Sequence, residues 1–181
     1  MNKYHQPGFT LIEILIYIAL VSGILIAAST FAWNIIGSKT KTQTIQEVQG
    51  NGYLVMEHVN NVIRSGRDIN ATSSLNINLA DNANAGKFLS LSMRNGAVNP
   101  TIIDVVNGVV RMRQGTGSAV ALSSNLVRVT NLTFTDRRDP AGKTKNIEIL
   151  LTIENINPQN TSERAATLTL QSADELLDIP R

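Results

Sequence analysis

The chain has 181 residues, of which 43% are hydrophobic and 17% are charged, with a formal net charge of +2. It has no cysteine, which excludes a disulfide framework, a thiolate metal site and a cysteine nucleophile. The densest basic group, Arg137, Arg138, Lys143 and Lys145, lies in a predicted turn rather than along one face, so a nucleic-acid partner is not expected.

The first 36 residues divide into a polar segment and a long apolar one. Residues 1–8, MNKYHQPG, are predicted to be a leader that ends in Gly8, and residues 9–36 contain a single charged side chain, Glu13. A helix of about 20 apolar residues crosses a hydrocarbon core about 30 Å thick. A secretory signal has a shorter apolar stretch, with its cleavage site after that stretch. We therefore predict a transmembrane helix over residues 9–36 that stays on the mature protein.

The junction GFTLIEILIYIAL resembles the class III signal of type IV prepilins and type II secretion pseudopilins. In that family a membrane peptidase cleaves after the glycine and N-methylates the next residue, which implies cleavage after Gly8 and N-methylation of Phe9. The resemblance also implies that Glu13 pairs with the new amino group of Phe9, in the same or a neighbouring subunit, and sets the axial register of assembly. A carboxylate costs about 2.5 to 3.5 kcal/mol at the bilayer centre, so Glu13 needs either headgroup water or such a partner.

Membrane orientation is taken from the motif rather than from charge. The positive-inside rule favours the opposite topology, because Lys3 precedes the apolar segment whereas Lys39 and Lys41 follow it. The peptidase of the family acts on the cytoplasmic face. The resemblance therefore implies a single-pass protein of the inner membrane, with its head on the periplasmic or extracellular side.

Apolar residues then recur every three or four positions, which predicts that one helix runs from Thr10 to Arg67 and is amphipathic over residues 37–67. Its predicted apolar face comprises Ile45, Val48, Val55, Met56, Val59, Val62 and Ile63. Gly50 and Gly52 each cost about 1 kcal/mol relative to alanine in a helix. We interpret them as points of local weakness or close packing on a sheet, with a hinge as the alternative.

Residues 68–86 are rich in Asn, Ala and Ser and are predicted to form a connecting loop, with an optional short strand at residues 75–79. In the pilin family this connection is displayed at the surface, which makes it a candidate contact surface.

From residue 87 to residue 181 the hydrophobic pattern alternates, which predicts a series of strands. They are expected at residues 88–91, 102–106, 109–113, 119–122, 126–135, 146–156 and 164–171. Asn107-Gly108 between two of them is the strongest short hairpin signal. Because no helix separates the strands, we predict one antiparallel sheet covered on one face by the amphipathic half-helix. The expected fold class is α+β and pilin-like, with a head at residues 87–181.

No group of residues in the sequence predicts an enzyme. His5 lies in the leader, and His58 has no second histidine or cysteine to complete a metal shell. Asp136 and Asp139 offer oxygen ligands to calcium, as loops of some relatives do, but a solvated turn beside two arginines is the preferred interpretation. We therefore expect no catalytic residue, no metal and no cofactor.

The expected function is that of a minor type IV pilin or a type II secretion pseudopilin, which assembles through its helix in filament initiation or at the tip. The layout resembles J-type subunits of type II secretion and W-type subunits of pili. The implied partners are other pilin or pseudopilin subunits, the prepilin peptidase, the inner-membrane assembly platform and the membrane. The alternative is a ligand-binding tip subunit, an adhesin or a DNA-uptake pilin, which predicts an exposed aromatic or basic cluster on the head.

Overall fold

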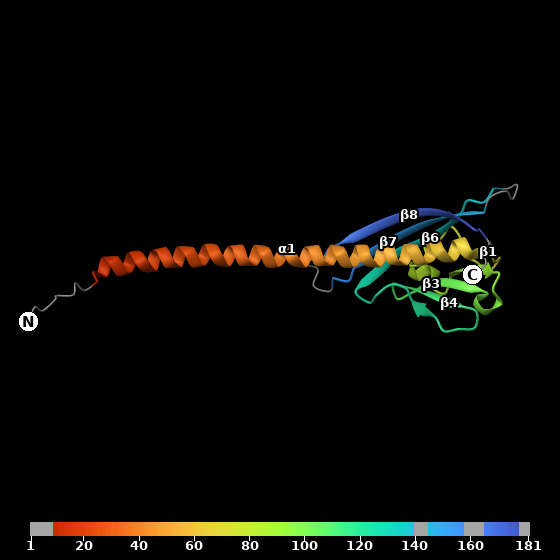
Figure 1. Cartoon of the computed structure of the whole chain (residues 1–181), viewed down its shortest axis with the longest axis horizontal. Coiled ribbons are helices and arrows are strands. Elements are labelled where there is room, and N and C mark those ends of the chain that lie inside the picture. The colour runs from red at the N-terminus through yellow and green to blue at the C-terminus, as the bar shows by residue number, and fades with distance from the viewer. Residues whose placement is uncertain (1–8, 140–144, 158–164, 178–181) are drawn as a thin grey trace, which may run out of the picture. The chain divides into compact units, whose positions relative to one another are not determined.

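The computed structural model describes residues 9–139, 145–157 and 165–177. One long helix, α1 (Leu11–Ser65), is followed by antiparallel strands, which confirms the predicted α+β class (Figure 1). The strands in the described part are β1 (Gly66–Ile69), β2 (Phe88–Met93), β3 (Thr101–Val106), β4 (Val109–Gln114), β5 (Val120–Ala121), β6 (Val127–Asp136), β7 (Asn146–Asn155) and β8 (Thr167–Glu175). Two short 3-10 helices, η1 (Asn82–Asn84) and η2 (Gly96–Val98), lie in the connections.

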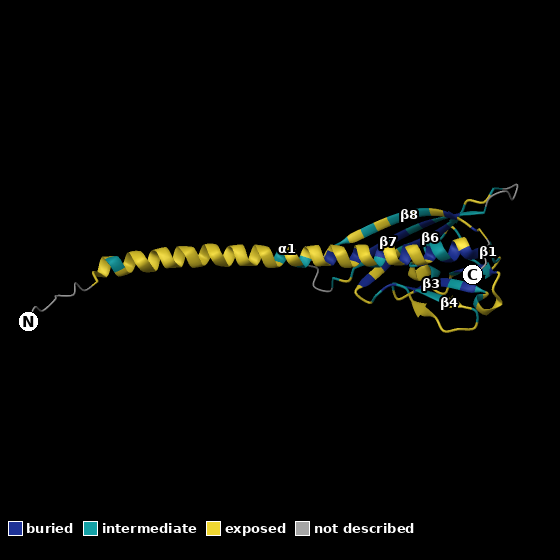
Figure 2. Ribbon diagram, viewed as in Figure 1, coloured by how far each residue is buried: buried dark blue, intermediate teal, exposed yellow. Residues whose placement is uncertain are grey.

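The chain divides into two compact units, residues 1–40 and residues 41–181, and α1 contributes to both. In the first unit the described residues are helical from Leu11, and nearly all of their side chains are exposed (Figure 2). This part of α1 is long and apolar enough to cross a membrane, by its length and composition. This helix fits a single-pass membrane protein.

The second unit begins at residue 41 and so extends beyond the head predicted at residues 87–181; from here on we call this whole unit the head. One face of α1 is buried there against the strands (Figure 2). Positions 44, 48, 52, 55, 59 and 62 follow the three- and four-residue spacing of a helix face, and all are buried. The predicted apolar face is confirmed except at Ile45, which is 37% exposed. Thr44 takes the inward position one residue earlier, and a step of one residue turns the next side chain away from the sheets.

The strands form two antiparallel sheets instead of the single sheet predicted for the head. The first has the order β1-β2-β3-β4-β5 and the second has the order β6-β7-β8. The ladder ends at β5, which has only two residues, and β6 pairs with β7 instead. The sheets meet where the Val129 amide donates to the Gly108 carbonyl at 2.8 Å. Alternating hydrophobicity identifies strands but does not determine which strands become neighbours.

Three further differences concern the boundaries of elements. The helix ends at Ser65 instead of Arg67. Residues 66–69, predicted as the helix end and the start of the loop, form β1 and pair with β2. The optional strand at residues 75–79 is reduced to an isolated bridge between Asn78 and Thr133. The last strand begins later and extends to Glu175 because its whole length pairs with β7.

The hairpin between β3 and β4 forms as predicted. Asn107 and Gly108 have φ angles of 53° and 76°, the left-handed pair that a type I′ turn requires. The hydrophobic core of the head lies between α1 and the sheets. Its largest fully buried side chains are Phe134, Ile63, Leu89, Leu91, Ile103, Leu132, Ile147, Ile149, Leu151 and Ile153.

Strand β8 is the strand of the second sheet that lies along α1. Gly52 faces Leu168, Asn60 Nδ2 donates to Ser172 Oγ at 3.1 Å, and Arg64 Nε donates to Asp174 Oδ1 at 2.7 Å. In these three contacts the residue numbers rise in the same order in α1 and in β8, so β8 runs in the same direction as this part of the helix. The Asp174 side chain is 6% exposed, and Arg64 therefore neutralises a buried carboxylate.

The two glycines of the amphipathic segment have different roles. A Cβ on Gly52 would lie 2.8 Å from Leu168 Cδ2 and 3.3 Å from Ile153 Cγ2, which confirms close packing on the sheet. A Cβ on Gly50 would meet nothing within 4 Å.

We expect Gly50→Ala to raise the unfolding free energy of the head by about 0.5 to 1 kcal/mol, because alanine restricts the unfolded chain and favours helix. We expect Gly52→Ala to lower it by about 1 kcal/mol, because overpacking against Leu168 outweighs the same helix gain. Urea unfolding of a fragment beginning at Lys41 measures both, and each variant is the control for the other. Equal stabilisation by the two substitutions would contradict the packing at Gly52.

Candidate functional site

The predicted processing and assembly residues lie at the start of α1. Thr10 caps the helix: its Oγ1 accepts from the Glu13 amide at 3.3 Å, and its carbonyl accepts from Glu13 and Ile14 at 3.1 and 3.2 Å. Thr-x-x-Glu is the sequence pattern of a capping box, and a carboxylate in the first turn interacts favourably with the helix dipole. The FTLIE motif therefore also encodes the start of the helix.

Glu13 differs from its neighbours in burial. Phe9 is 74% exposed, and among described residues 9–36 Glu13 alone is half-buried. Its Oε1 accepts a hydrogen bond from the Tyr17 hydroxyl, one turn further along the helix, at 3.4 Å. Gly8, and with it the predicted cleavage bond, lies outside the described residues, as does His5. Cleavage, N-methylation and the role of Glu13 thus remain predictions.

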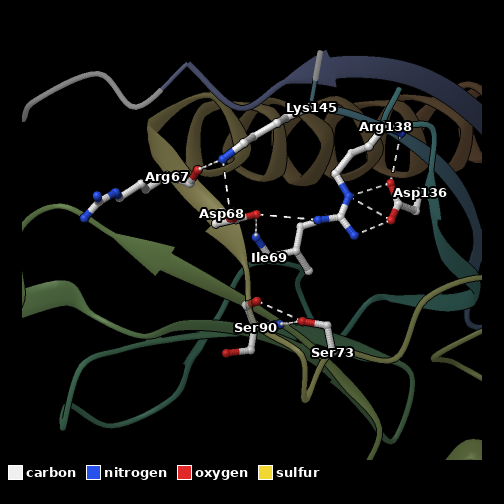
Figure 3. Close-up of polar contacts among 8 residues, drawn as sticks. All are labelled: Arg67, Asp68, Ile69, Ser73, Ser90, Asp136, Arg138 and Lys145. Atoms are coloured by element: carbon white, nitrogen blue, oxygen red, sulfur yellow. Dashed lines mark hydrogen bonds and ion pairs between the residues drawn. The ribbon is translucent and has the colours of Figure 1, made fainter. Parts of the chain in front are cut away.

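A second polar group occupies the end of the head where β1 meets β6 and β7 (Figure 3). Asp68 on β1 forms ion pairs with Lys145 Nζ at 3.3 Å and with Arg138 Nη1 at 3.5 Å. Lys145 also donates to the Arg67 carbonyl at 3.0 Å, and Arg138 donates to both carboxylate oxygens of Asp136. The group connects the strand that follows the helix with both long strands of the second sheet.

This arrangement bears on the two alternatives considered for the basic turn. Asp136, considered as a calcium ligand, is paired with Arg138, and the described residues contain no group of three or more residues suited to a metal ion. Residues 140–144 of the turn lie outside the described residues. Five basic side chains in the described part of the head, Arg64, Arg111, Arg137, Arg138 and Lys145, form ion pairs with acidic side chains.

The hydrogen bond from Arg138 lowers the pKa of the Asp136 carboxyl below its usual range. Hydrogen bonds from Arg137 and then Gln171 lower the pKa of Glu148 in the same way. A carboxyl with a lowered folded-state pKa stabilises the fold above its unfolded pKa, and that contribution is lost as the pH falls through the folded value.

We therefore expect the head to lose stability on acidification from about pH 5 to about pH 3. The Asp136→Asn/Glu148→Gln double variant should have a lower unfolding free energy than the wild type near neutral pH. Its unfolding free energy should also fall less than that of the wild type on acidification. The difference is small because these pairs are exposed to solvent. Urea midpoints of the fragment beginning at Lys41, measured across this range, test it; parallel curves for variant and wild type would contradict it.

Within the connecting loop, which stays a predicted contact surface, Asn78 and Leu79 dock on β6. The Leu79 amide donates to the Leu132 carbonyl at 2.8 Å, and the Leu79 side chain is 2% exposed. Asn78 Nδ2 donates to the Thr130 carbonyl at 3.0 Å, and Asn78 Oδ1 accepts from the Leu132 amide at 3.0 Å. This role of Asn78 was not predicted from the sequence, because its two bonds go to residues of β6 that lie more than 50 positions further along the chain.

His58 lies on the exposed side of α1. A hollow on the outer face of the first sheet is lined by Phe88, Ile102, Asp104, Arg111, Arg113 and Ala119. Two parallel hydrogen bonds, of 3.0 and 2.7 Å, join Arg111 there to Asp104.

No family model, curated protein or solved structure matches this chain. What is established is an α+β protein whose long N-terminal helix is apolar in its first part and packed on antiparallel strands in its second.

Proposed function

We propose that this chain is a minor type IV pilin or a type II secretion pseudopilin. The observation that carries the proposal is the junction GFTLIE directly before an apolar helix of membrane-spanning length, in a chain whose helix continues into an α+β head. A secretory signal followed by a soluble domain would not keep the apolar helix, whereas cleavage after Gly8 keeps it as the assembly element.

The chemistry of assembly follows from two charges one turn apart. Cleavage after Gly8 creates a positive amino group on Phe9, and Glu13 is the only acidic or basic side chain between Phe9 and Ile36. When apolar helices of several subunits pack together, headgroup water is excluded and each buried charge needs a partner. Pairing of the Glu13 carboxylate with the Phe9 amine of the same or an adjoining subunit satisfies both and determines the axial register.

The remaining parts of the proposal follow from the same family resemblance. The subunit is anchored in the inner membrane with its head on the periplasmic or extracellular side, and it acts in filament initiation or at the tip. Its partners are other pilin or pseudopilin subunits, the prepilin peptidase and the assembly platform. Ion pairing of five basic side chains in the described part of the head, Arg137, Arg138 and Lys145 of the basic turn among them, favours this structural role over DNA capture.

The test is mass spectrometry of the amino-terminal peptide after expression with and without a prepilin peptidase. We expect the chain to begin at N-methyl-Phe9 only when the peptidase is present, and a Gly8→Leu variant to stay uncleaved. Failure of cleavage by a peptidase that processes a known prepilin in the same cells would overturn the proposal.

The same peptide, followed in sheared extracellular filaments and in membranes, separates the two machines. Its presence in the sheared material indicates a surface pilus, whereas confinement to the membrane fraction indicates a short pseudopilus or an initiation complex. Binding of DNA or glycan by the isolated head would instead favour the ligand-binding alternative.

A further inference from the structure

We propose that Tyr17 is the positioning residue for Glu13: its hydroxyl donates a hydrogen bond that holds the carboxylate against the helix before and during assembly. The inference rests on the proposed function, since the orientation of Glu13 matters only if it meets the Phe9 amine. Tyr17 falls within the segment GFTLIEILIYIAL, but the family resemblance assigns it no role.

Helix geometry brings the two side chains together. Residues four positions apart lie on the same face, and the side chain of the later residue leans back toward the helix N-terminus. The Tyr17 hydroxyl accordingly reaches Glu13 Oε1 at 3.4 Å. Glu13 is also the one half-buried residue among the exposed ones from Phe9 to Ile36, which fits a side chain that is not fully extended into the surroundings.

Tyrosine suits this position chemically. Its ring is apolar enough for a membrane helix, and its hydroxyl is a hydrogen-bond donor that carries no charge. A bond to an ionised carboxylate becomes shorter and stronger once water is excluded, so we expect the 3.4 Å separation to shorten in the assembled state. The hydroxyl bonds to one carboxylate oxygen, Oε1, and an ionised carboxylate has further acceptor sites that can accept from the amine of Phe9. Tyr17 thus presents the carboxylate in one orientation.

The competing role for Tyr17 is that of an aromatic side chain packing at a membrane interface, which needs the ring but not the hydroxyl. Tyr17→Phe separates the two roles because it removes only the oxygen. Ser22→Ala is the matched control, since it removes a hydroxyl from the same segment whose bond, at 2.6 Å, goes to the Ile18 carbonyl of its own helix.

The experiment is a double-mutant cycle on the full chain, with incorporation into filaments as the readout. We expect Tyr17→Phe to reduce incorporation about tenfold, the lower range for a hydrogen bond to a charged group, and Ser22→Ala to leave it unchanged. In a Glu13→Ala background Tyr17→Phe should have no further effect. Equal losses in both backgrounds, or no loss from Tyr17→Phe where Glu13→Ala is defective, would overturn the inference and leave the proposed function standing.

A second readout does not depend on assembly. In the full chain labelled with carboxyl-¹³C glutamate in detergent micelles, the Glu13 signal is the one that disappears in Glu13→Gln. We expect Tyr17→Phe to shift this signal and Ser22→Ala to leave it in place. An unshifted signal in Tyr17→Phe would contradict the bond directly, whereas normal incorporation of Glu13→Ala would count against the proposed function itself.

Discussion

Glu13→Ala is expected to be cleaved and N-methylated normally but to enter filaments at about one-hundredth of the wild-type level or less. Removing one member of a buried ion pair leaves the other charge uncompensated, at a cost of about 3 to 5 kcal/mol. The Thr10 cap of the helix is retained, because Thr10 Oγ1 accepts from the backbone amide of Glu13 and not from its side chain. Processing and assembly are therefore separable at this residue.

The measurement is the ratio of the Phe9 peptide in sheared filaments to that in membranes, by quantitative mass spectrometry. Glu13→Gln keeps the size and hydrogen-bonding capacity of the side chain without its charge and should be as defective as Glu13→Ala. Glu13→Asp keeps the charge on a shorter side chain and should still be incorporated into filaments in part. Wild-type incorporation of Glu13→Gln would show that the charge is not required.

Asn78→Ala is expected to lower the unfolding free energy of the head by about 2 to 3 kcal/mol. The Asn78 amide bonds to Thr130, where the register between β6 and β7 shifts, and to Leu132 just beyond that point. Its Oδ1 also accepts from the Ala80 amide at 2.9 Å, so one side chain joins the loop to an irregular strand edge. Alanine leaves these backbone groups without their partner.

Urea unfolding of the fragment beginning at Lys41 gives the size of this effect. Asn82→Ala, an exposed change in η1 of the same loop, should stay within about 0.5 kcal/mol of the wild type. Asn78→Asp keeps the acceptor but loses the donor to Thr130, so we expect an intermediate loss. A wild-type midpoint for Asn78→Ala would show that the side-chain bonds of Asn78 contribute nothing to the stability of the head.

Local patterns were sufficient for most of the secondary structure. The helix bounds differ from the prediction by one residue at the start and two at the end, and the Asn107-Gly108 hairpin forms as expected. These features depend on neighbours in sequence, namely helix periodicity, strand alternation and turn chemistry. The division into two sheets and the pairing of residues 66–69 depend on contacts between distant segments, which no local pattern specifies.

The same distinction applies to the candidate site. The GFTLIE motif indicates Gly8, Phe9 and Glu13 from sequence alone, because the family resemblance is local. The Tyr17 contact is also local. Residues four positions apart lie on the same face of a helix, so the spacing of Glu13 and Tyr17 is enough to predict it. The bonds of Asn78 to β6 could not, since they depend on the tertiary packing of the loop.

The alignment of β8 with α1 has a mechanical consequence. Gly52, Asn60 and Arg64 contact Leu168, Ser172 and Asp174 in the same order along both segments. A tensile load applied along this part of the helix would therefore act on all three contacts at once, in shear, instead of opening them one after another from an end. Axial force on this part of the helix would thus be shared among the three contacts.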